Sequence, residues 1–136
     1  MITPQLFRRI YRASAWYDLC VTWVFATPVT LALFWPLLQG INAAMGAPAP
    51  TPDLGVYAML FGNFFGTVVV IWSLVRLRLD LPALGRADAV GRVAFSLWMI
   101  TALANGAGPV LWLFLTFEIC WAAVQLLPVR VPAAAE

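Results

Sequence analysis

Four long apolar runs, separated by short polar segments, dominate this sequence. They cover residues 13–38, 54–77, 90–105 and 109–127. At about 1.5 Å per residue the first run makes a helix of roughly 39 Å, and the hydrocarbon core of a bilayer is about 30 Å thick. The runs therefore predict membrane-spanning helices. The predicted fold is one all-α domain over residues 1–136, a polytopic bundle of four transmembrane helices.

The composition agrees with a membrane protein and excludes several kinds of chemistry. Hydrophobic residues make up 63% of the chain and charged residues 10%, whereas soluble domains carry about a quarter charged residues. The absence of histidine removes the commonest metal ligand and the usual general base near neutral pH. The net charge of +2 is too small to indicate a nucleic-acid partner. We therefore expect no enzyme activity, no metal and no cofactor.

The arginines predict how the chain is oriented. All eight basic residues are arginines, and they lie within residues 1–12, 76–92 and 128–136. With four spans these segments share one side of the membrane, and the positive-inside rule makes that side the cytoplasm, so both termini are predicted to be cytoplasmic. Four arginines of the middle segment are expected to fix the topology and to contact lipid headgroups: Arg76, Arg78, Arg86 and Arg92. The lysine-free, Arg- and Ala-rich composition is typical of GC-rich bacterial genomes, so the predicted location is a bacterial inner membrane.

The first run contains two prolines, and the second contains a pair of glycines spaced for helix packing. Pro28 is expected to kink the first span, and Pro36 to mark its exit from the membrane. Gly62 and Gly66 form a GxxxG motif, which lets another helix approach closely.

Glu118 is the only charged residue of the fourth run. An ionisable side chain at that depth indicates a functional site, because its burial in hydrocarbon is costly unless a partner compensates it. Counting along the helices at ~1.5 Å per residue places Glu118 roughly 13 Å deep, level with Thr22. The same count places Asp18 nearer the interface, so the two carboxylates are not expected to form an acid–base pair.

Helical spacing predicts that polar side chains of all four spans face inward and form one polar seam. Asp18 and Thr22 are four residues apart, as are Asn63 and Thr67. The predicted members of the polar seam are Asp18, Thr22, Asn63, Thr67, Ser96, Glu118 and Gln125.

Three functions are compatible with such a seam. In the first, which the sequence favours, the protein is a non-enzymatic accessory or structural module, and the seam holds the helices together through interhelical hydrogen bonds. In the second, the protein binds a lipid or another lipophilic small molecule in an intramembrane pocket with Glu118 or Asn63 as its polar anchor. In the third, Glu118 is the proton site of a small transporter. The expected partners are membrane lipids, a lipophilic ligand or another membrane protein.

Three short motifs carry a resemblance to known proteins: WYDL at Trp16–Leu19, APTPDL at Ala49–Leu54 and RLDLPALGR at Arg78–Arg86. Together they resemble an uncharacterised bacterial family of small proteins with four spans. The architecture is similar to DoxX-like membrane proteins, which are often accessory subunits of redox systems. It is also similar to the emopamil-binding group, whose bundles open a lipophilic pocket lined by acidic residues and Trp. The resemblance implies a fold and a topology, and the missing histidine sets this chain apart from the isomerases of that group.

Overall fold

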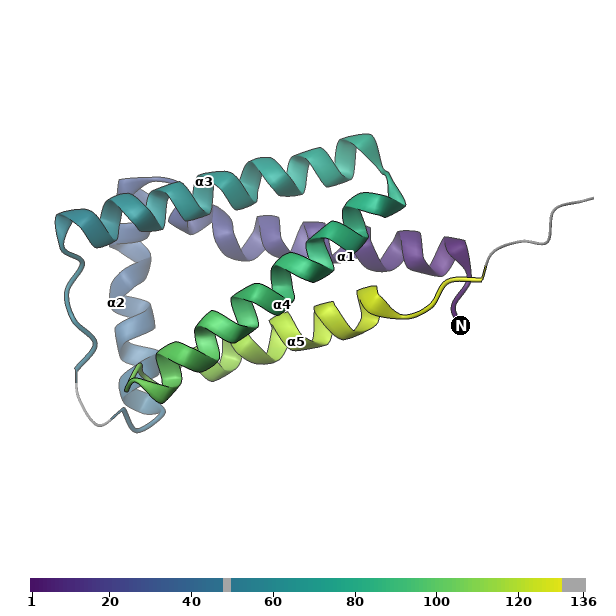
Figure 1. The fold of residues 1–136 in the computed structure, drawn as a ribbon. Helices are drawn as coiled ribbons and strands as arrows, with labels where there is room; N and C mark the ends of the chain where they lie inside the picture. The colour runs from purple at the N-terminus through teal and green to yellow at the C-terminus, as the bar shows by residue number, and fades with distance from the viewer. Residues whose placement is uncertain (48–49, 131–136) are drawn as a thin grey trace, which may run out of the picture.

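A computed structural model describes residues 1–47 and 50–130, which form five α-helices and one short 3-10 helix (Figure 1). Ala49, part of one motif noted above, lies outside the described residues. The elements, in chain order, are α1 (Pro4–Thr22), η1 (Trp23–Phe25), α2 (Pro28–Ala44), α3 (Val56–Leu79), α4 (Pro82–Ala104) and α5 (Leu111–Leu126). The prediction of an all-α fold is confirmed for the part of the chain that the structure describes.

Two helices, α3 and α4, are each long and apolar enough to cross a membrane. The bent pair Pro4–Phe25 and Pro28–Ala44 passes the same test jointly, and α5 is a shorter apolar helix of 16 residues. Helix α4 begins at Pro82, eight residues before the predicted span at 90–105. Pro82 lies in the first turn of α4, where its missing N–H costs no hydrogen bond. The charged residues that follow it are therefore helical.

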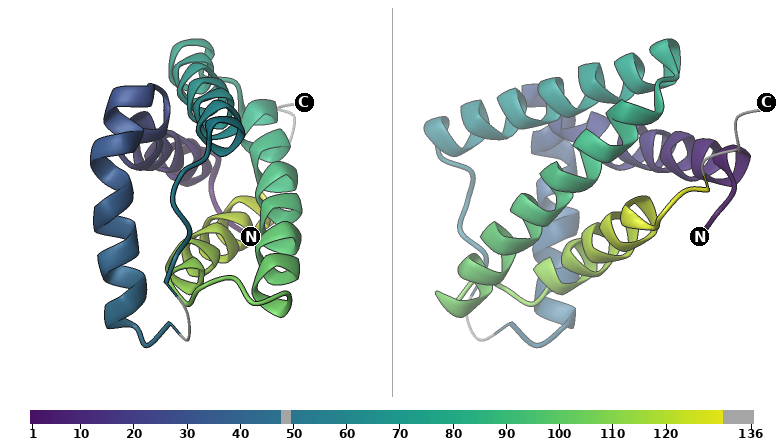
Figure 2. Two further views of the ribbon diagram at one scale, coloured as in Figure 1. Left: turned by 90° about the vertical axis from the view of Figure 1, so that its left-hand side faces the viewer. Right: turned by 45° about the vertical axis from the view of Figure 1, so that its right-hand side comes forward.

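The apolar run over residues 13–38 is not one helix, because the chain turns by 97° between Phe25 and Pro28. Thr27 is extended and caps α2 by accepting a hydrogen bond from the Thr30 N–H at 3.2 Å. Pro28, expected to kink a span, instead starts a helix. Helix α2 therefore lies across one end of the bundle (Figures 1 and 2), and Pro36, the predicted exit, lies inside it.

Helix α3 completes the corner between η1 and α2. A Cβ on Gly66 would lie 2.3 Å from the backbone of Phe25, so the two backbones touch at this glycine. Asn63 Nδ2 donates a hydrogen bond to the Phe25 carbonyl at 2.9 Å, and Thr67 Oγ1 donates one to the Ala26 carbonyl at 3.3 Å. These bonds satisfy carbonyls that the helix break leaves without partners.

Helices α3 and α4 diverge from a tight turn at Asp80 (Figures 1 and 2). The main packing partner of α3 is α1, and that of α4 is α5. Asp80 ends α3 in the left-handed conformation, with φ of 52°. Gly106, with φ of +89°, lies in the turn that joins α4 to α5, as the Asn-Gly and Gly-Pro signals around it predict.

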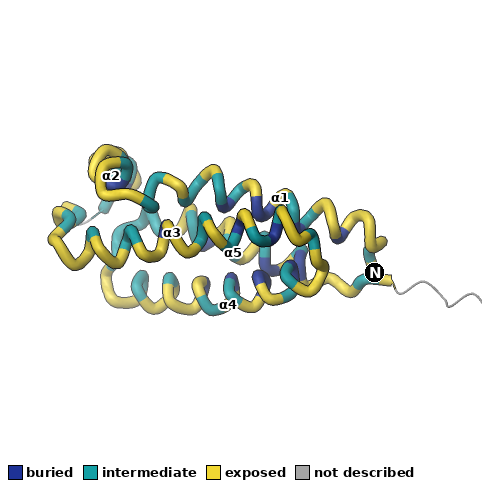
Figure 3. Tube along the Cα trace, turned by 90° about the horizontal axis from the view of Figure 1, so that it is seen from above, coloured by how far each residue is buried: buried dark blue, intermediate teal, exposed yellow. Residues whose placement is uncertain are grey.

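The interior of the bundle contains polar and charged residues beside a small apolar core, and its outer surface is rich in large apolar side chains. Figure 3 shows most of the buried residues on the half of the bundle nearer the N-terminus. Large exposed side chains such as Leu33 (77% exposed), Val68 and Trp98 cover the outside. This distribution suits a chain whose surroundings are lipid. The buried polar and charged residues are Ser14, Asp18, Asn42, Ser73, Arg76, Asp88, Arg92, Ser96 and Gln125.

Candidate functional site

Five charged side chains from four helices form one buried group, which we call the charged cluster. Asp18 comes from α1, Arg76 from α3, Asp88 and Arg92 from α4, and Glu118 from α5. The cluster thus links all four of the helices that run along the bundle.

Arg76 is fully enclosed, with a side chain that is 0% exposed. Its Nη2 lies 2.5 Å from Asp18 Oδ2, and its Nη1 lies 2.6 Å from Asp88 Oδ2. Nη1 also donates a hydrogen bond to Ser14 Oγ at 3.1 Å, and the guanidinium lies 5.8 Å from the ring centre of Trp72. Arg76 therefore joins α3 to α1 and α4 at once.

Arg92 holds the other side of the charged cluster. Its Nη2 lies 2.5 Å from Asp18 Oδ2, its Nε lies 2.9 Å from Asp88 Oδ2, and its Nη1 lies 3.0 Å from both oxygens of Glu118. The planar fork of a guanidinium allows this triple pairing, which a lysine ammonium would not reproduce. All three nitrogens of Arg92 are occupied by carboxylates.

Neutral polar groups complete the environment of Asp88. Gln125 Nε2 donates hydrogen bonds to Asp88 Oδ2 at 3.1 Å and to Ser14 Oγ at 2.5 Å. Trp72 Nε1 donates one to Asp88 Oδ1 at 2.9 Å. Asp88 is therefore compensated by two guanidiniums, an amide and an indole, as a buried carboxylate requires.

The charged cluster contains two members of the predicted polar seam, Asp18 and Glu118, and a third member, Gln125, donates a hydrogen bond to it through Asp88. Two other members, Asn63 and Thr67, bond to the corner at Phe25 instead. The remaining two hydroxyls bond to carbonyls of their own helices: Thr22 Oγ1 to Asp18 at 2.5 Å and Ser96 Oγ to Arg92 at 2.8 Å.

Two expectations about positions differ from the structure. Depth counting separated Asp18 from Glu118, yet both carboxylates bind Arg92. Counting residues along the helix axes does not take into account that the long side chain of Arg92 can reach carboxylates at different depths on neighbouring helices. Arg76 and Arg92 were expected at lipid headgroups, whereas they are 0% and 3% exposed inside the bundle.

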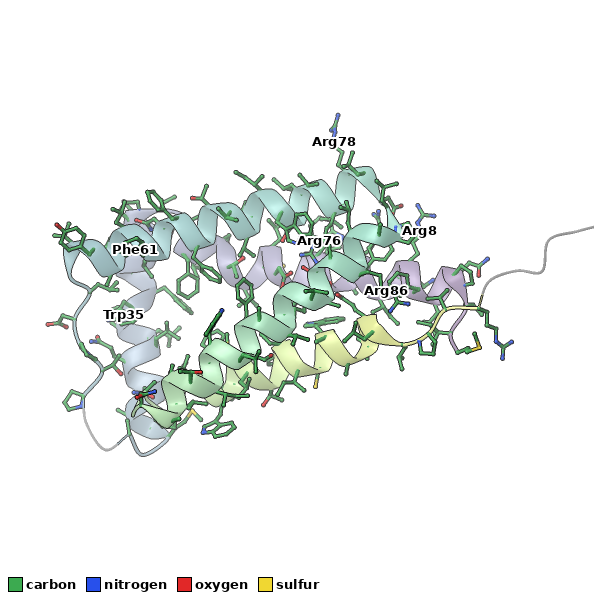
Figure 4. The ribbon with its side chains drawn as sticks, viewed as in Figure 1. Arg8, Trp35, Phe61, Arg76, Arg78 and Arg86 are labelled. Carbon is green, nitrogen blue, oxygen red and sulfur yellow. The ribbon has the colours of Figure 1, made fainter. Side chains whose placement is uncertain are left out.

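Arg78 and Arg86 do lie away from the charged cluster. Figure 4 shows Arg78 pointing away from the bundle and Arg76 turned toward its interior. Arg86 donates hydrogen bonds to the carbonyls of Gln125 and Leu127, which caps the end of α5. Its guanidinium lies 4.5 Å from the ring centre of Phe7.

Asp88 is the site residue that the sequence analysis missed, and Arg76 and Arg92 are the two that it assigned to a different role. Asp88 and Arg92 are four residues apart, the spacing of an ion pair on one helix face. That spacing can be read from the sequence, but residues 76–92 were interpreted as a segment between spans that fixes the topology, so the helical spacing was not applied to them.

Two cavities border the charged cluster. The first, of about 520 Å³, lies between α3 and α4 and reaches the outer surface beside the exposed Val68 and Trp98. The second, of about 420 Å³, extends toward α2 and the segment at Thr51 and Pro52. Both are mainly apolar, and six residues line both of them: Asp18, Thr22, Phe65, Met99, Leu111 and Glu118.

A second, exposed set of ionic contacts holds the α3–α4 turn, and we call it the turn latch. Arg8 and Arg12 pair with the Asp80 carboxylate, and Tyr11 Oη donates hydrogen bonds to Asp80 Oδ1 at 2.5 Å and to its carbonyl at 2.9 Å. The hydrogen bonds from Arg8 and Tyr11 hold the pKa of the Asp80 carboxyl well below its usual range.

In residues 1–47 and 50–130 no group of three His, Cys, Asp or Glu side chains is placed to hold a metal ion. Comparison of the chain with protein-family models, curated proteins and solved structures gives no match. The resemblance to the small four-span bacterial family therefore stays a prediction.

Proposed function

We propose that the chain is a multi-pass protein of a bacterial inner membrane, with α1, α3, α4 and α5 as its four spans and both termini in the cytoplasm. The unit Pro4–Phe25 is roughly 33 Å long at ~1.5 Å per residue. Arg8, Arg78 and Arg86 lie at one end of the bundle, opposite Trp35 and Phe61 (Figure 4), which agrees with the positive-inside rule.

In this arrangement α2 lies in the plane of the membrane at the outer end. Its outward side chains are apolar, with Val29 69% and Leu37 55% exposed, so lipid chains are their natural surroundings. Helix α2 and the segment at Thr51 then form the outer boundary of the second cavity.

The function that the geometry supports best is the binding of a lipophilic molecule with a polar headgroup. The observation that carries this proposal is the position of Glu118 on the shared wall of two apolar cavities. Apolar walls with a few polar groups at one end are typical of small-molecule sites. The opening between α3 and α4 faces lipid in the proposed topology, so such a molecule can enter from the bilayer.

The other two hypotheses have less support. A purely structural seam needs no cavity, and a closed bundle would have favoured it. A proton transporter needs access to Glu118 from both sides of the membrane. Arg76 of the charged cluster and its neighbours Ser14 and Gln125 are fully buried. This burial favours a site that opens on one side only.

The test is mass spectrometry of lipids and small molecules retained by the purified full chain. Gly91 lines the first cavity, and a Cβ there meets no heavy atom within 4 Å, so Gly91→Phe adds a bulky side chain at the cavity wall from an unobstructed position. Gly40→Phe is the matched control, because Gly40 is equally open and lines neither cavity.

We expect the wild type and Gly40→Phe to retain the same lipophilic molecule and Gly91→Phe to lose most of it. Equal retention by Gly91→Phe, or a wild type that carries only detergent, would contradict the proposal.

A further inference from the structure

The charged cluster has an unbalanced charge. It contains three carboxylates and two guanidiniums, so it carries one excess negative charge when all five groups are ionised. The chain has no lysine or histidine, and the other described arginines are placed elsewhere. Arg8 and Arg12 pair with Asp80, Arg86 caps α5, and three more are exposed: Arg9, Arg78 and Arg130.

The excess charge is least compensated at Glu118. Asp88 forms ion pairs with both guanidiniums and accepts hydrogen bonds from Gln125 and Trp72, and Asp18 binds both guanidiniums. Among residues 1–47 and 50–130, Glu118 has one partner, the Nη1 of Arg92. Its side chain is also the most exposed carboxylate of the charged cluster, at 15% against 8% and 7% for Asp18 and Asp88. The carboxylate with the fewest partners is thus the most exposed of the three, and it lines both cavities.

Neither arginine of the charged cluster is free to bind an anion in the cavities. All three nitrogens of Arg92 are already bound to carboxylates. Arg76 keeps one unpartnered nitrogen, its Nε, but its side chain is 0% exposed and lines neither cavity. An anionic headgroup at this wall would meet the excess negative charge of the charged cluster and no guanidinium that is free to bind it.

Aromatic side chains add to the preference for a cation. Phe65 of α3 and Phe95 of α4 both line the first cavity, with ring centres 6.0 Å apart, and Trp98 lies on the same wall. The face of an aromatic ring attracts a cation, most strongly when water is excluded.

From these observations we infer that the pocket selects amphiphiles with a positively charged headgroup, such as lipophilic amines or quaternary ammonium compounds. The headgroup binds beside Glu118 and the apolar part fills the cavities. The inference rests on the proposed function, because it specifies the ligand of the same site.

Three forms of one fluorescent probe test the charge preference. Diphenylhexatriene exists as a trimethylammonium, an unsubstituted and a carboxylate derivative, which share one apolar body and differ in charge. Saturable binding to the purified full chain is measured by energy transfer from tryptophan, and the signal of Gly91→Phe is subtracted as the background of probe in detergent. We expect the cationic form to bind roughly tenfold more tightly than the neutral form, and the carboxylate form to show no saturable binding.

Two variants locate the source of the preference. Glu118→Gln keeps the size and polarity of the side chain and should bring the cationic form to parity with the neutral form. Trp98→Leu, at a side chain that is 68% exposed and therefore dispensable for folding, should weaken the cationic form more than the neutral one.

The outcomes separate the two proposals. Saturable binding of all three forms with equal affinity would overturn the charge inference and leave the pocket intact. A cation preference that survives in both variants would also overturn it. If no form binds above the Gly91→Phe background, the proposed function fails and the inference fails with it.

Discussion

The charged cluster and the turn latch both use arginine and aspartate to join α1 to α3 and α4. In the turn latch, Arg8 is 63% exposed and water and salt screen its attraction to Asp80. In the charged cluster, Arg76 and Arg92 are almost fully buried, and every charge depends on the others for compensation. The two sites use the same residue types, so we expect their contributions to the free energy of unfolding to differ because of their surroundings.

The largest effect is expected from removing a central cation of the charged cluster. Arg92→Leu leaves Asp18, Asp88 and Glu118 with one guanidinium among them, and we expect the free energy of unfolding to fall by about 3–5 kcal/mol. The measurement is a titration with sodium dodecyl sulfate from a mild detergent. Arg78→Leu is the control, because Arg78 points away from the bundle (Figure 4), and its effect should stay within about 0.5 kcal/mol. Equal effects of the two variants would remove the distinction between buried and exposed arginines.

An intermediate effect is expected at the edge of the charged cluster. Glu118→Leu leaves one nitrogen of Arg92 without an acceptor, and we expect a loss of about 1–3 kcal/mol in the same titration. Glu118→Gln keeps an acceptor for Arg92 and should be tolerated better. If the Leu variant is as stable as the wild type, Glu118 does not contribute to holding the bundle together.

The smallest effect is expected at the turn latch, where it depends on pH. The pKa of Asp80 is lower in the folded protein than in an unfolded chain, where an aspartate titrates near 3.9. The turn latch therefore stabilises the fold above roughly pH 4, and its contribution falls as the pH drops below that value. The difference in melting temperature between the wild type and Asp80→Asn should be present at pH 7 and shrink as the medium is acidified.

Asp53→Asn is the matched control for acidification, because Asp53 accepts only a 3.4 Å hydrogen bond from Gln39. If the difference in melting temperature between the wild type and Asp80→Asn grows on acidification, the assignment of a lowered pKa to the folded-state Asp80 is wrong.

The apolar runs at 54–77 and 109–127 predict the ends of α3 and α5 to within two residues, because the length of an apolar run can be read directly from the sequence. The run at 13–38 is instead divided between two helices, and α4 begins eight residues before the run at 90–105. The break at Phe25 is harder to predict, since Thr27 and Pro28 serve equally as a kink or as the start of a new helix. The structure resolves this ambiguity through Asn63 and Thr67, which lie 38 and 41 residues away from the carbonyls they satisfy. The sequence around Phe25 does not indicate which distant residues will satisfy its carbonyls.

The charged cluster shows a second limit of prediction. Glu118 was identified because a carboxylate in an apolar run has few explanations. Arg76 and Arg92 were assigned to the lipid surface, because an arginine near the end of a span has two explanations, headgroup contact or inward pairing. Only the rotation of the helix distinguishes them, and the Asp88–Arg92 spacing was the one available sign of inward pairing.

The corner at Phe25 also has a consequence for the order of assembly in the membrane. Its free carbonyls are satisfied by Asn63 and Thr67, and Gly66 lets the two backbones touch. All three residues belong to α3, which is synthesised after the corner itself. Thr27 and Pro28 can start α2 as soon as they are synthesised, but the two free carbonyls lack their partners until α3 is in place. The corner is therefore completed by a helix that follows it in the chain.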